Sequence, residues 1–201
     1  MGYCNSWWRT PADKIYHDTE WGIPLNEDRM QFEFLMLEVM QCGLSWQLML
    51  KKRAIFRNCF DNFQYNKIAK YGPKDIKRIL AAPGMIQSPR KIKAIIQNAK
   101  AFCQIRKEYG SFSRFLWNYC GNKTIVYTGH ASGKVPVSNG LSARISADLK
   151  KHGFSFLGPI TVYSHLQACG IINDHSADCP LFAAINKKYP TVHQARNKEI
   201  F

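Results

Sequence analysis

The 201-residue sequence contains no long hydrophobic run. A membrane-spanning helix needs ~20 consecutive apolar residues, and no stretch approaches that length. Residues 1–10 also lack the basic start and the apolar core of a secretory signal. We therefore expect a cytoplasmic protein that has no membrane partner.

Two further absences narrow the chemistry. The seven cysteines are odd in number and irregularly spaced, which does not fit a disulfide framework, so most are expected to be reduced thiols. The sequence has neither the glycine pattern of a phosphate-binding P-loop nor that of a dinucleotide-binding turn. The sequence therefore indicates neither a disulfide-bonded scaffold nor a nucleotide-dependent enzyme.

Acidic residues are scarce, since 14 Asp and Glu stand against 28 Lys and Arg and leave a net charge of +14. With 46% hydrophobic residues, the chain can still form a folded core, in one domain or two small ones. Residues 1–50 carry a net charge of −4, whereas residues 51–108 carry +12. This middle segment is either a phosphate-binding surface or a solvated cationic face.

Apolar residues recur at three- and four-residue spacing through most of the chain, which predicts helices. The predicted helices span residues 26–41, 46–60, 74–82, 89–108, 112–119, 139–153 and 160–169. Residues 122–140 are rich in Gly, Ser and Thr and are predicted to form a loop. No segment sustains the two-residue alternation of a strand, so the predicted fold class is all-α.

The basic segment contains a helix, a tight turn at residues 83–88 and a second helix that begins with Pro89. Turn amides and a helix N-terminus can bind a phosphate, and Arg90, Lys91 and Lys93 would add positive charge. Proteins use such a hairpin to hold a DNA backbone without reading bases. An ordinary connection between two packed helices fits the sequence equally well.

Four potential metal ligands lie near the two ends of the sequence. Cys4 and His17 come early, and His175 and Cys179 lie four residues apart near the end. Two thiolates and two imidazoles are a set that structural zinc favours, although buried thiols and unrelated surface histidines remain the alternative. Such a zinc ion would have four protein ligands and no open position for a water molecule, so its role would be structural.

The first quarter of the chain is rich in aromatic residues and contains one isolated carboxylate. Its aromatic residues include Tyr3, Trp7, Trp8, Tyr16, Trp21 and Trp46. These rings could form a core or stack on an unpaired base. Glu38 is the only charged residue within residues 34–40. If buried, this carboxylate needs a cation or hydrogen-bond donors, and a cationic ligand would serve.

Several segments together resemble the bacterial 3-methyladenine DNA glycosylase I family, and the resemblance runs from Cys4 to Cys179. The segments that carry it are residues 16–24 (YHDTEWGIP), 37–38 (LE), 43–46 (GLSW), 50–53 (LKKR), 91–99 (KIKAIIQNA) and 167–175 (QACGIINDH). The resemblance implies an all-helical helix-hairpin-helix glycosylase fold, with the hairpin at about residues 74–108 and a zinc site joining the N- and C-terminal segments. Residues 1–180 would form one unit, and residues 181–201 would be an extension of unknown role.

The implied activity is monofunctional hydrolysis that releases 3-methyladenine from alkylated double-stranded DNA, carried out by a monomer. Glu38 would be the catalytic residue that contacts the flipped base, and Tyr16, Trp21 and Trp46 would line its pocket. Arg90, Lys91 and Lys93 are the expected contacts to the DNA backbone. The resemblance also implies one structural Zn²⁺ ion, whose ligands would be Cys4, His17, His175 and Cys179. The alternative is a non-catalytic, zinc-stapled DNA-binding protein.

The sequence departs from the family pattern in three places: at Asp13, at residues 6–8 (SWW), which replace a Cys-x-Trp start, and in the hairpin at residues 85–90 (MIQSPR), where an Arg is expected soon after Ile86. Asp13 occupies a site where close relatives can carry an aromatic residue near the mouth of the pocket.

Overall fold

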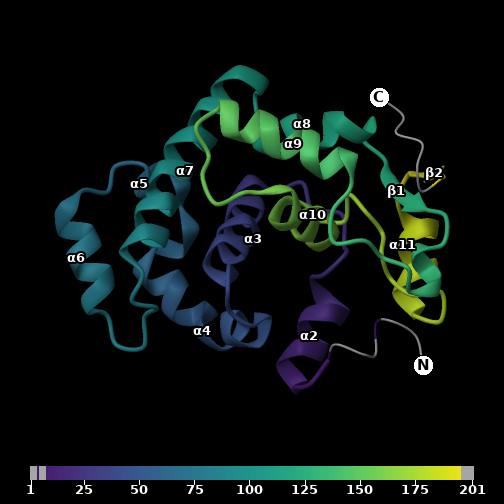
Figure 1. The fold of residues 1–201 in the computed structure, drawn as a ribbon, viewed down its shortest axis with the longest axis horizontal. Helices are drawn as coiled ribbons and strands as arrows, with labels where there is room; N and C mark the ends of the chain where they lie inside the picture. Colours follow the sequence, from purple (N-terminus) through teal and green to yellow (C-terminus); the bar gives the residue numbers. More distant parts are fainter. Residues whose placement is uncertain (1–3, 5–7, 196–201) are drawn as a thin grey trace.

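The computed structural model describes residue 4 and residues 8–195, and these are mostly helical (Figure 1). The α-helices are α2 (Pro11–Thr19), α3 (Asp28–Gln41), α4 (Trp46–Cys59), α5 (Tyr65–Ile68), α6 (Pro73–Ala81), α7 (Pro89–Tyr109), α8 (Phe112–Trp117), α9 (Gly140–Lys151), α10 (Pro159–Ala168) and α11 (Pro180–Lys188). Short 3₁₀ turns are η1 (Asp61–Phe63), η2 (Asn118–Cys120) and η3 (His130–Ser132). The strands are β1 (Thr124–Tyr127) and β2 (Thr191–Gln194).

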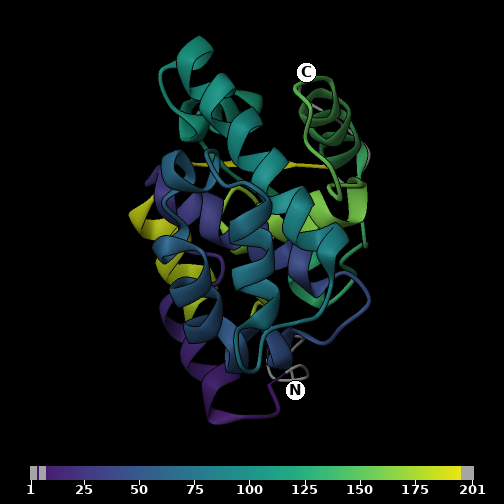
Figure 2. The same cartoon turned by 90° about the vertical axis from the view of Figure 1, so that its left-hand side faces the viewer.

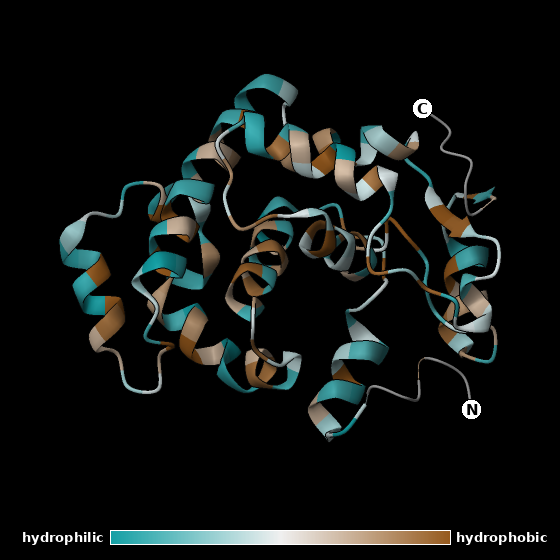
Figure 3. Cartoon of the chain, in the orientation of Figure 1, coloured by the Kyte–Doolittle hydropathy of each residue, from teal (hydrophilic) through white to brown (hydrophobic). Residues whose placement is uncertain are grey.

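Helix α3 lies at the centre of the molecule. It packs against α4, α7, α8 and α10, and every residue from Gln31 to Met40 is buried (Figures 1 and 2). A helix surrounded on all sides has no single apolar stripe. Hydrophilic and hydrophobic stretches instead alternate along α6, α7 and α9 (Figure 3).

Local sequence signals fix several helix ends as predicted. Ser45 caps α4, because its hydroxyl accepts a hydrogen bond from the backbone N–H of Leu48 at 3.3 Å. Asn139 caps α9 in the same way through the N–H of Ser142. Helices α6 and α7 are joined by residues 82–88, and Pro89 occupies the first turn of α7.

The described residues are mostly helical, in agreement with the all-α prediction, and the two short strands are an addition to it. They pair in parallel, with Thr124 opposite Thr191, and β1 also bridges to Ile172. All four residues of β1 are buried, so this strand shows no alternation of apolar and polar residues. A four-residue strand whose partner lies far along the chain leaves no periodic signal in the sequence. The predicted loop at 122–140 therefore contains a strand that braces the segment leading to the C-terminal Cys and His residues.

Helix α2 was not among the predicted helices, although its start carries a capping box. Thr10 and Asp13 cap each other's backbone N–H groups, and the Asp13 carboxylate also accepts from Arg9 N at 3.0 Å. Asp13 is fully buried. It thus supports the start of α2 instead of supplying an aromatic ring.

The turn after α2 lies directly against the end of α10. Gly22 N donates to Ala168 O at 3.2 Å, and Leu25 N donates to Cys169 O at 3.1 Å. A Cβ atom at Gly170 would lie 2.4 Å from Pro24 N, and the φ of this residue is +73°. Only glycine allows so close an approach of the two backbones. Among the described residues, no helix has the length and apolar character needed to cross a membrane.

Candidate active site

A cavity of about 250 Å³ opens where α2, α3, α4 and α10 meet. It is lined by Tyr16, Trp21, Glu38, Gln41, Trp46, Gln47, Ser164 and Gln167. The four pocket residues named from the sequence thus lie around one cavity. Helix α2 and the turn after it supply Tyr16 and Trp21, α3 supplies Glu38, and the first turn of α4 supplies Trp46.

Glu38 brings a carboxyl group to this cavity. The residue is 5% exposed, and burial raises its pKa from 4.5 to about 8. Among the residues that the structure describes, none donates a hydrogen bond to the Glu38 carboxylate or forms an ion pair with it. The negative form is therefore costly until a cation or hydrogen-bond donor enters the cavity.

Two buried hydrogen-bond donors accompany this carboxyl group. Tyr16 Oη and Trp46 Nε1 have no hydrogen-bond partner in the described part of the chain. Their rings lie 5.2 Å apart at 47°, and Tyr16 also packs edge-on against Phe34. Burial, followed by the nearby Glu38 carboxylate, raises the pKa of Tyr16 well above its ordinary value, so its hydroxyl stays neutral. Flat rings, unpaired donors and an unpaired acid together suit a flat polar ligand.

The polar residues that α10 contributes were not singled out from the sequence. Gln167 lines the cavity, and its Nε2 donates to Asp174 Oδ2 at 2.9 Å. Asp174 also accepts from Tyr163 Oη at 2.7 Å and lies 2.7 Å from His130 Nδ1. This buried carboxylate fixes which way the Gln167 amide points. Gln167 begins one of the family segments, but its position at the cavity depends on how α10 packs.

A buried ion cluster joins the elements around the cavity. The Arg53 guanidinium forms two hydrogen bonds with Glu20, at 2.6 and 2.7 Å, and a third with Glu33 at 2.6 Å. Arg29 and Arg57 also contact Glu33, whose pKa these three arginines lower despite burial. Because Glu20 precedes Trp21 directly, the cluster ties one wall of the cavity to α4.

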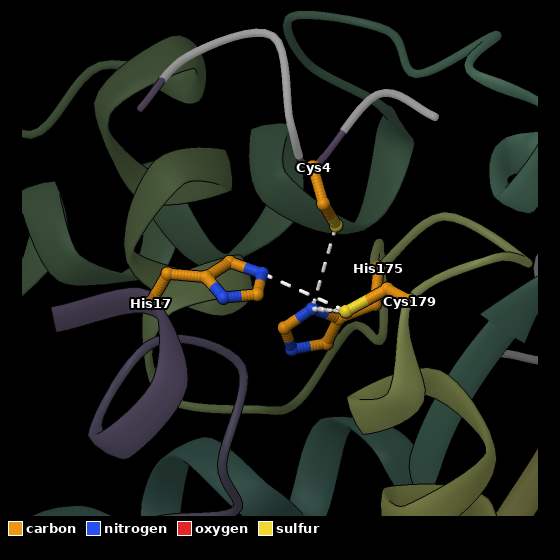
Figure 4. A group of neighbouring side chains, drawn as sticks. All are labelled: Cys4, His17, His175 and Cys179. Atoms are coloured by element: carbon orange, nitrogen blue, oxygen red, sulfur yellow. Dashed lines mark hydrogen bonds between the residues drawn. The ribbon is translucent and has the colours of Figure 1, made fainter. Parts of the chain in front are cut away.

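The four predicted metal ligands converge at one point. Cys4, His17, His175 and Cys179 are all buried, and their ligand atoms lie within 4.8 Å of one another (Figure 4). His175 Nδ1 is 3.6 Å from both sulfur atoms, and His17 Nε2 is 3.8 Å from Cys179 Sγ. This cluster could hold a metal ion, and it brings the two ends of the described chain together.

The surroundings of the histidines prepare them as ligands. Asp18 Oδ1 lies 2.8 Å from His17 Nδ1, which leaves the other ring nitrogen to face the cluster. Burial lowers the pKa of His17 and takes that of His175 to about 4, so both imidazoles are neutral at pH 7. Trp21 stands edge-on to His175 at 4.7 Å, so the cluster also supports the wall of the cavity.

The three basic residues at the start of α7 differ in exposure. Arg90 and Lys93 are exposed, and the Arg90 guanidinium lies 5.7 Å from the Phe156 ring centroid. Lys91 is buried, and its ammonium contacts backbone carbonyls. These hydrogen bonds favour a role for Lys91 other than phosphate binding.

Trp7 lies outside the described residues, whereas Trp8 packs against His17 with centroids 4.5 Å apart.

Comparison with known proteins identifies the family. The family model described as methyladenine glycosylase matches residues 7–183, which is most of the chain. The chain belongs to the methyladenine glycosylase family. Two curated relatives of this family come from Escherichia coli and Haemophilus influenzae. The E. coli DNA-3-methyladenine glycosylase 1 is 39% identical over 84% of this chain and 90% of its own length. The H. influenzae DNA-3-methyladenine glycosylase is 40% identical over 82% and 89%.

Solved structures in the methyladenine glycosylase family share the fold. A tyrosine-to-phenylalanine variant of 3-methyladenine DNA glycosylase I in complex with 3-methyladenine has a TM-score of 0.84 at 36% identity, over 90% of this chain and 97% of that one. The Staphylococcus aureus 3-methyladenine DNA glycosylase I has a TM-score of 0.83, also at 36% identity, over 88% and 94%. At these identities, the similarity covers the sequence as well as the fold.

Proposed function

We propose that this protein is a DNA glycosylase that releases 3-methyladenine from alkylated double-stranded DNA by hydrolysing the N-glycosidic bond. The observation that carries the proposal is the unpaired, buried Glu38 carboxyl group among the rings of Tyr16, Trp21 and Trp46. Relatives named for this reaction, and a relative bound to 3-methyladenine, support it.

Charge selects the base in this proposal. Methylation at N3 makes adenine cationic, so the flipped base supplies the counter-ion that Glu38 lacks. The cation stabilises the carboxylate and lowers its pKa, while the aromatic faces stack on the ring. Normal adenine is neutral and would leave the buried carboxylate unpaired. The pocket therefore favours the damaged base over the normal one.

Bond cleavage needs little further chemistry, because the cationic purine is a good leaving group. The bond between the anomeric carbon and N9 breaks, and its electron pair neutralises the base. A water oxygen then bonds to the anomeric carbon of the oxocarbenium-like sugar and loses a proton to solvent. Glu38 holds the base and its negative charge stabilises the developing cationic sugar.

We assign the Cys4, His17, His175 and Cys179 cluster to one structural Zn²⁺ ion. A tetrahedral zinc with bonds of about 2.3 Å to sulfur and 2.05 Å to nitrogen separates those two ligand atoms by about 3.6 Å. The sulfur–nitrogen distances in this cluster are 3.6 and 3.8 Å. Zinc bound there would cross-link the two ends of the chain, and its four protein ligands leave no position for the substrate.

The helix α6, the turn at residues 82–88 and helix α7 form the proposed helix-hairpin-helix that holds the DNA backbone. The turn amides and the N-terminus of α7 would bind a phosphate, and exposed Arg90 and Lys93 would add charge. These contacts position the duplex but do not read its bases.

The proposed organisation follows from this substrate. One copy of the chain supplies every residue that lines the cavity, so we propose a monomer, and because the proposed substrate is DNA we propose that it acts in the cytoplasm. Residues 1–180 would be the glycosylase unit. The extension at residues 181–201 would brace the unit through β2, which pairs with β1.

The direct test is to incubate the protein with methylated genomic DNA and to identify the freed bases by chromatography. The proposal expects 3-methyladenine in the supernatant, and 3-methylguanine as well if the pocket admits it. A non-catalytic DNA-binding protein would release neither base. The buried carboxyl group argues against that alternative, because a module that only binds the backbone has no use for it.

Excision should depend on pH through Glu38. Its pKa of about 8 leaves the carboxyl group mostly neutral at pH 7, and the carboxylate forms as pH rises. We expect kcat/KM to rise about tenfold per pH unit below pH 8 and to level off above it. Steady-state kinetics on an oligonucleotide with one lesion would measure this. A profile that is flat from pH 6 to pH 9 would contradict the assignment.

The reaction should leave no covalent intermediate. Among the described residues no lysine lines the cavity, so no amine is available there to form a Schiff base. Treatment of a reacting mixture with borohydride should therefore give no protein–DNA adduct on a denaturing gel. A bifunctional glycosylase in a parallel reaction provides the positive control, and a stable adduct with this protein would refute simple hydrolysis.

A further inference from the structure

Lys91 is buried although it lies in the most basic segment of the chain. Its exposed fraction is 9%, and its Nζ donates to Met40 O at 2.7 Å and to Cys42 O at 2.6 Å. Lys93, one half-turn further along α7, is exposed. The Lys91 ammonium is therefore directed at the protein interior, whereas a side chain that binds a DNA phosphate needs to reach solvent.

The two carbonyls that Lys91 contacts lie at the C-terminal end of α3. The last carbonyls of a helix have no partner within it, and a positive charge there is favourable. Leu44 N donates a hydrogen bond to Gln41 O, and Lys91 Nζ donates to the carbonyls on either side, those of Met40 and Cys42. The lysine thus replaces the cap that the backbone of this helix end does not provide.

This helix end carries one wall of the cavity. Glu38 lies two residues before Met40, Gln41 also lines the cavity, and the chain reaches Trp46 a few residues later. A shift of the last turn of α3 would therefore move the carboxyl group relative to the ring that stacks on the base. Displacements of about 1 Å can cost a hundredfold in rate.

The same lysine belongs to the proposed DNA-binding hairpin. Lys91 lies in the first turn of α7, where its N–H donates to the Ser88 hydroxyl at 3.5 Å. A second lysine, Lys52 of α4, contacts Gly84 O within the turn. Three hydrogen bonds from an ammonium to a backbone carbonyl, two from Lys91 and one from Lys52, therefore connect the hairpin with the elements around the cavity.

We propose that Lys91 is a positioning residue for base excision. It caps α3 so that Glu38 faces the flipped base, and it fixes the hairpin to the wall of the pocket. This inference rests on the proposed function of the cavity. It separates the basic residues of α7 into two roles, because exposed Arg90 and Lys93 remain the phosphate contacts.

The test compares K91M with K93A in two binding assays. Titration with free 3-methyladenine, followed by tryptophan fluorescence, reports on the cavity because Trp21 and Trp46 line it. We expect K91M to lower the affinity for free 3-methyladenine at least tenfold and to lower kcat by a similar factor. Its affinity for an undamaged duplex should change less than about threefold. K93A should lower the affinity for the duplex and leave the affinity for free 3-methyladenine unchanged.

Two controls separate positioning from a general loss of structure. All assays run below the unfolding temperature of each variant, as measured by circular dichroism. K91R keeps a cationic donor and should recover part of both the free-base affinity and kcat, and it also serves if K91M does not fold. Loss of duplex affinity with unchanged free-base binding in K91M or K91R would make Lys91 a phosphate ligand and overturn the inference. Wild-type behaviour of K91M would do so as well. If the wild-type protein released no 3-methyladenine, the proposed function itself would fail.

Discussion

Replacing Glu38 by glutamine should lower the excision of 3-methyladenine about a hundredfold. Glutamine keeps the size and one hydrogen-bond acceptor but removes the negative charge that pairs with the cationic base. The predicted loss corresponds to about 2.7 kcal/mol of transition-state stabilisation, a reasonable value for one buried charge–charge contact. Single-turnover kinetics on a duplex with one lesion would measure it. The affinity for undamaged duplex should not change, because Glu38 lies in the cavity, whereas the proposed phosphate contacts Arg90 and Lys93 lie exposed on α7.

The same variant should be more stable than the natural protein. The pKa of Glu38 rises from 4.5 to about 8 on folding, so the folded state binds this proton more tightly than the unfolded state does. The carboxyl group therefore costs stability progressively as pH rises from 4.5 to 8. At pH 7 the cost is on the order of 3 kcal/mol, which E38Q would remove. Thermal denaturation at pH 5 and pH 8 should show a gain that grows with pH. An active E38Q, or one less stable than wild type at pH 8, would contradict the role of Glu38.

Removing the proposed Zn²⁺ ion should lower the unfolding temperature by about 10 °C. The cluster joins Cys4 and His17 to His175 and Cys179, so a metal cross-link closes a loop of most of the chain. Closing a long loop stabilises a folded protein by about 4 kcal/mol, and each kcal/mol shifts the unfolding temperature by about 2–4 °C at this size. Differential scanning calorimetry with and without a strong chelator would measure the shift, and added Zn²⁺ should reverse it.

Cysteine variants provide the matched comparison for the metal. C179S should lose zinc by elemental analysis and should unfold at the temperature of the chelated protein. C59S changes another buried cysteine that lies outside the cluster, and it should retain one zinc ion per chain. At a temperature where the chelated protein is still folded, we expect residual excision, because the role that we propose for the metal is structural. Complete loss of excision in a folded, metal-free protein would contradict a structural role.

The sequence predicted those helices whose signals are local. Ser45 and Asn139 each lie where a cap is needed, and Pro89 marks the first turn of α7. The capping box of Thr10 and Asp13 is an equally clear local signal for the start of α2. The helix was not predicted, because the spacing of apolar residues does not reveal so short a helix. Strand β1 could not be predicted, because its pairing depends on residues much further along the chain.

The candidate site was predicted largely through resemblance, and the reason is physical. Helix α3 is buried on all sides, so no periodic pattern indicates that Glu38 faces a cavity. The position of Gln167 depends on how α10 packs, which its own sequence does not encode. Lys91 did leave a usable signal, since it lies four residues before Ile95 and therefore on the buried face of α7. Charge alone made it indistinguishable from Lys93.

The cluster of Cys4, His17, His175 and Cys179 also depends on the order of events during protein synthesis. A ribosome makes Cys4 and His17 long before their partners His175 and Cys179. The wall of the cavity from α10 is equally late, and β2 follows it. A partly made chain therefore has neither a closed cluster nor a complete pocket. We therefore expect that a chain released before α10 is complete does not remove bases from DNA.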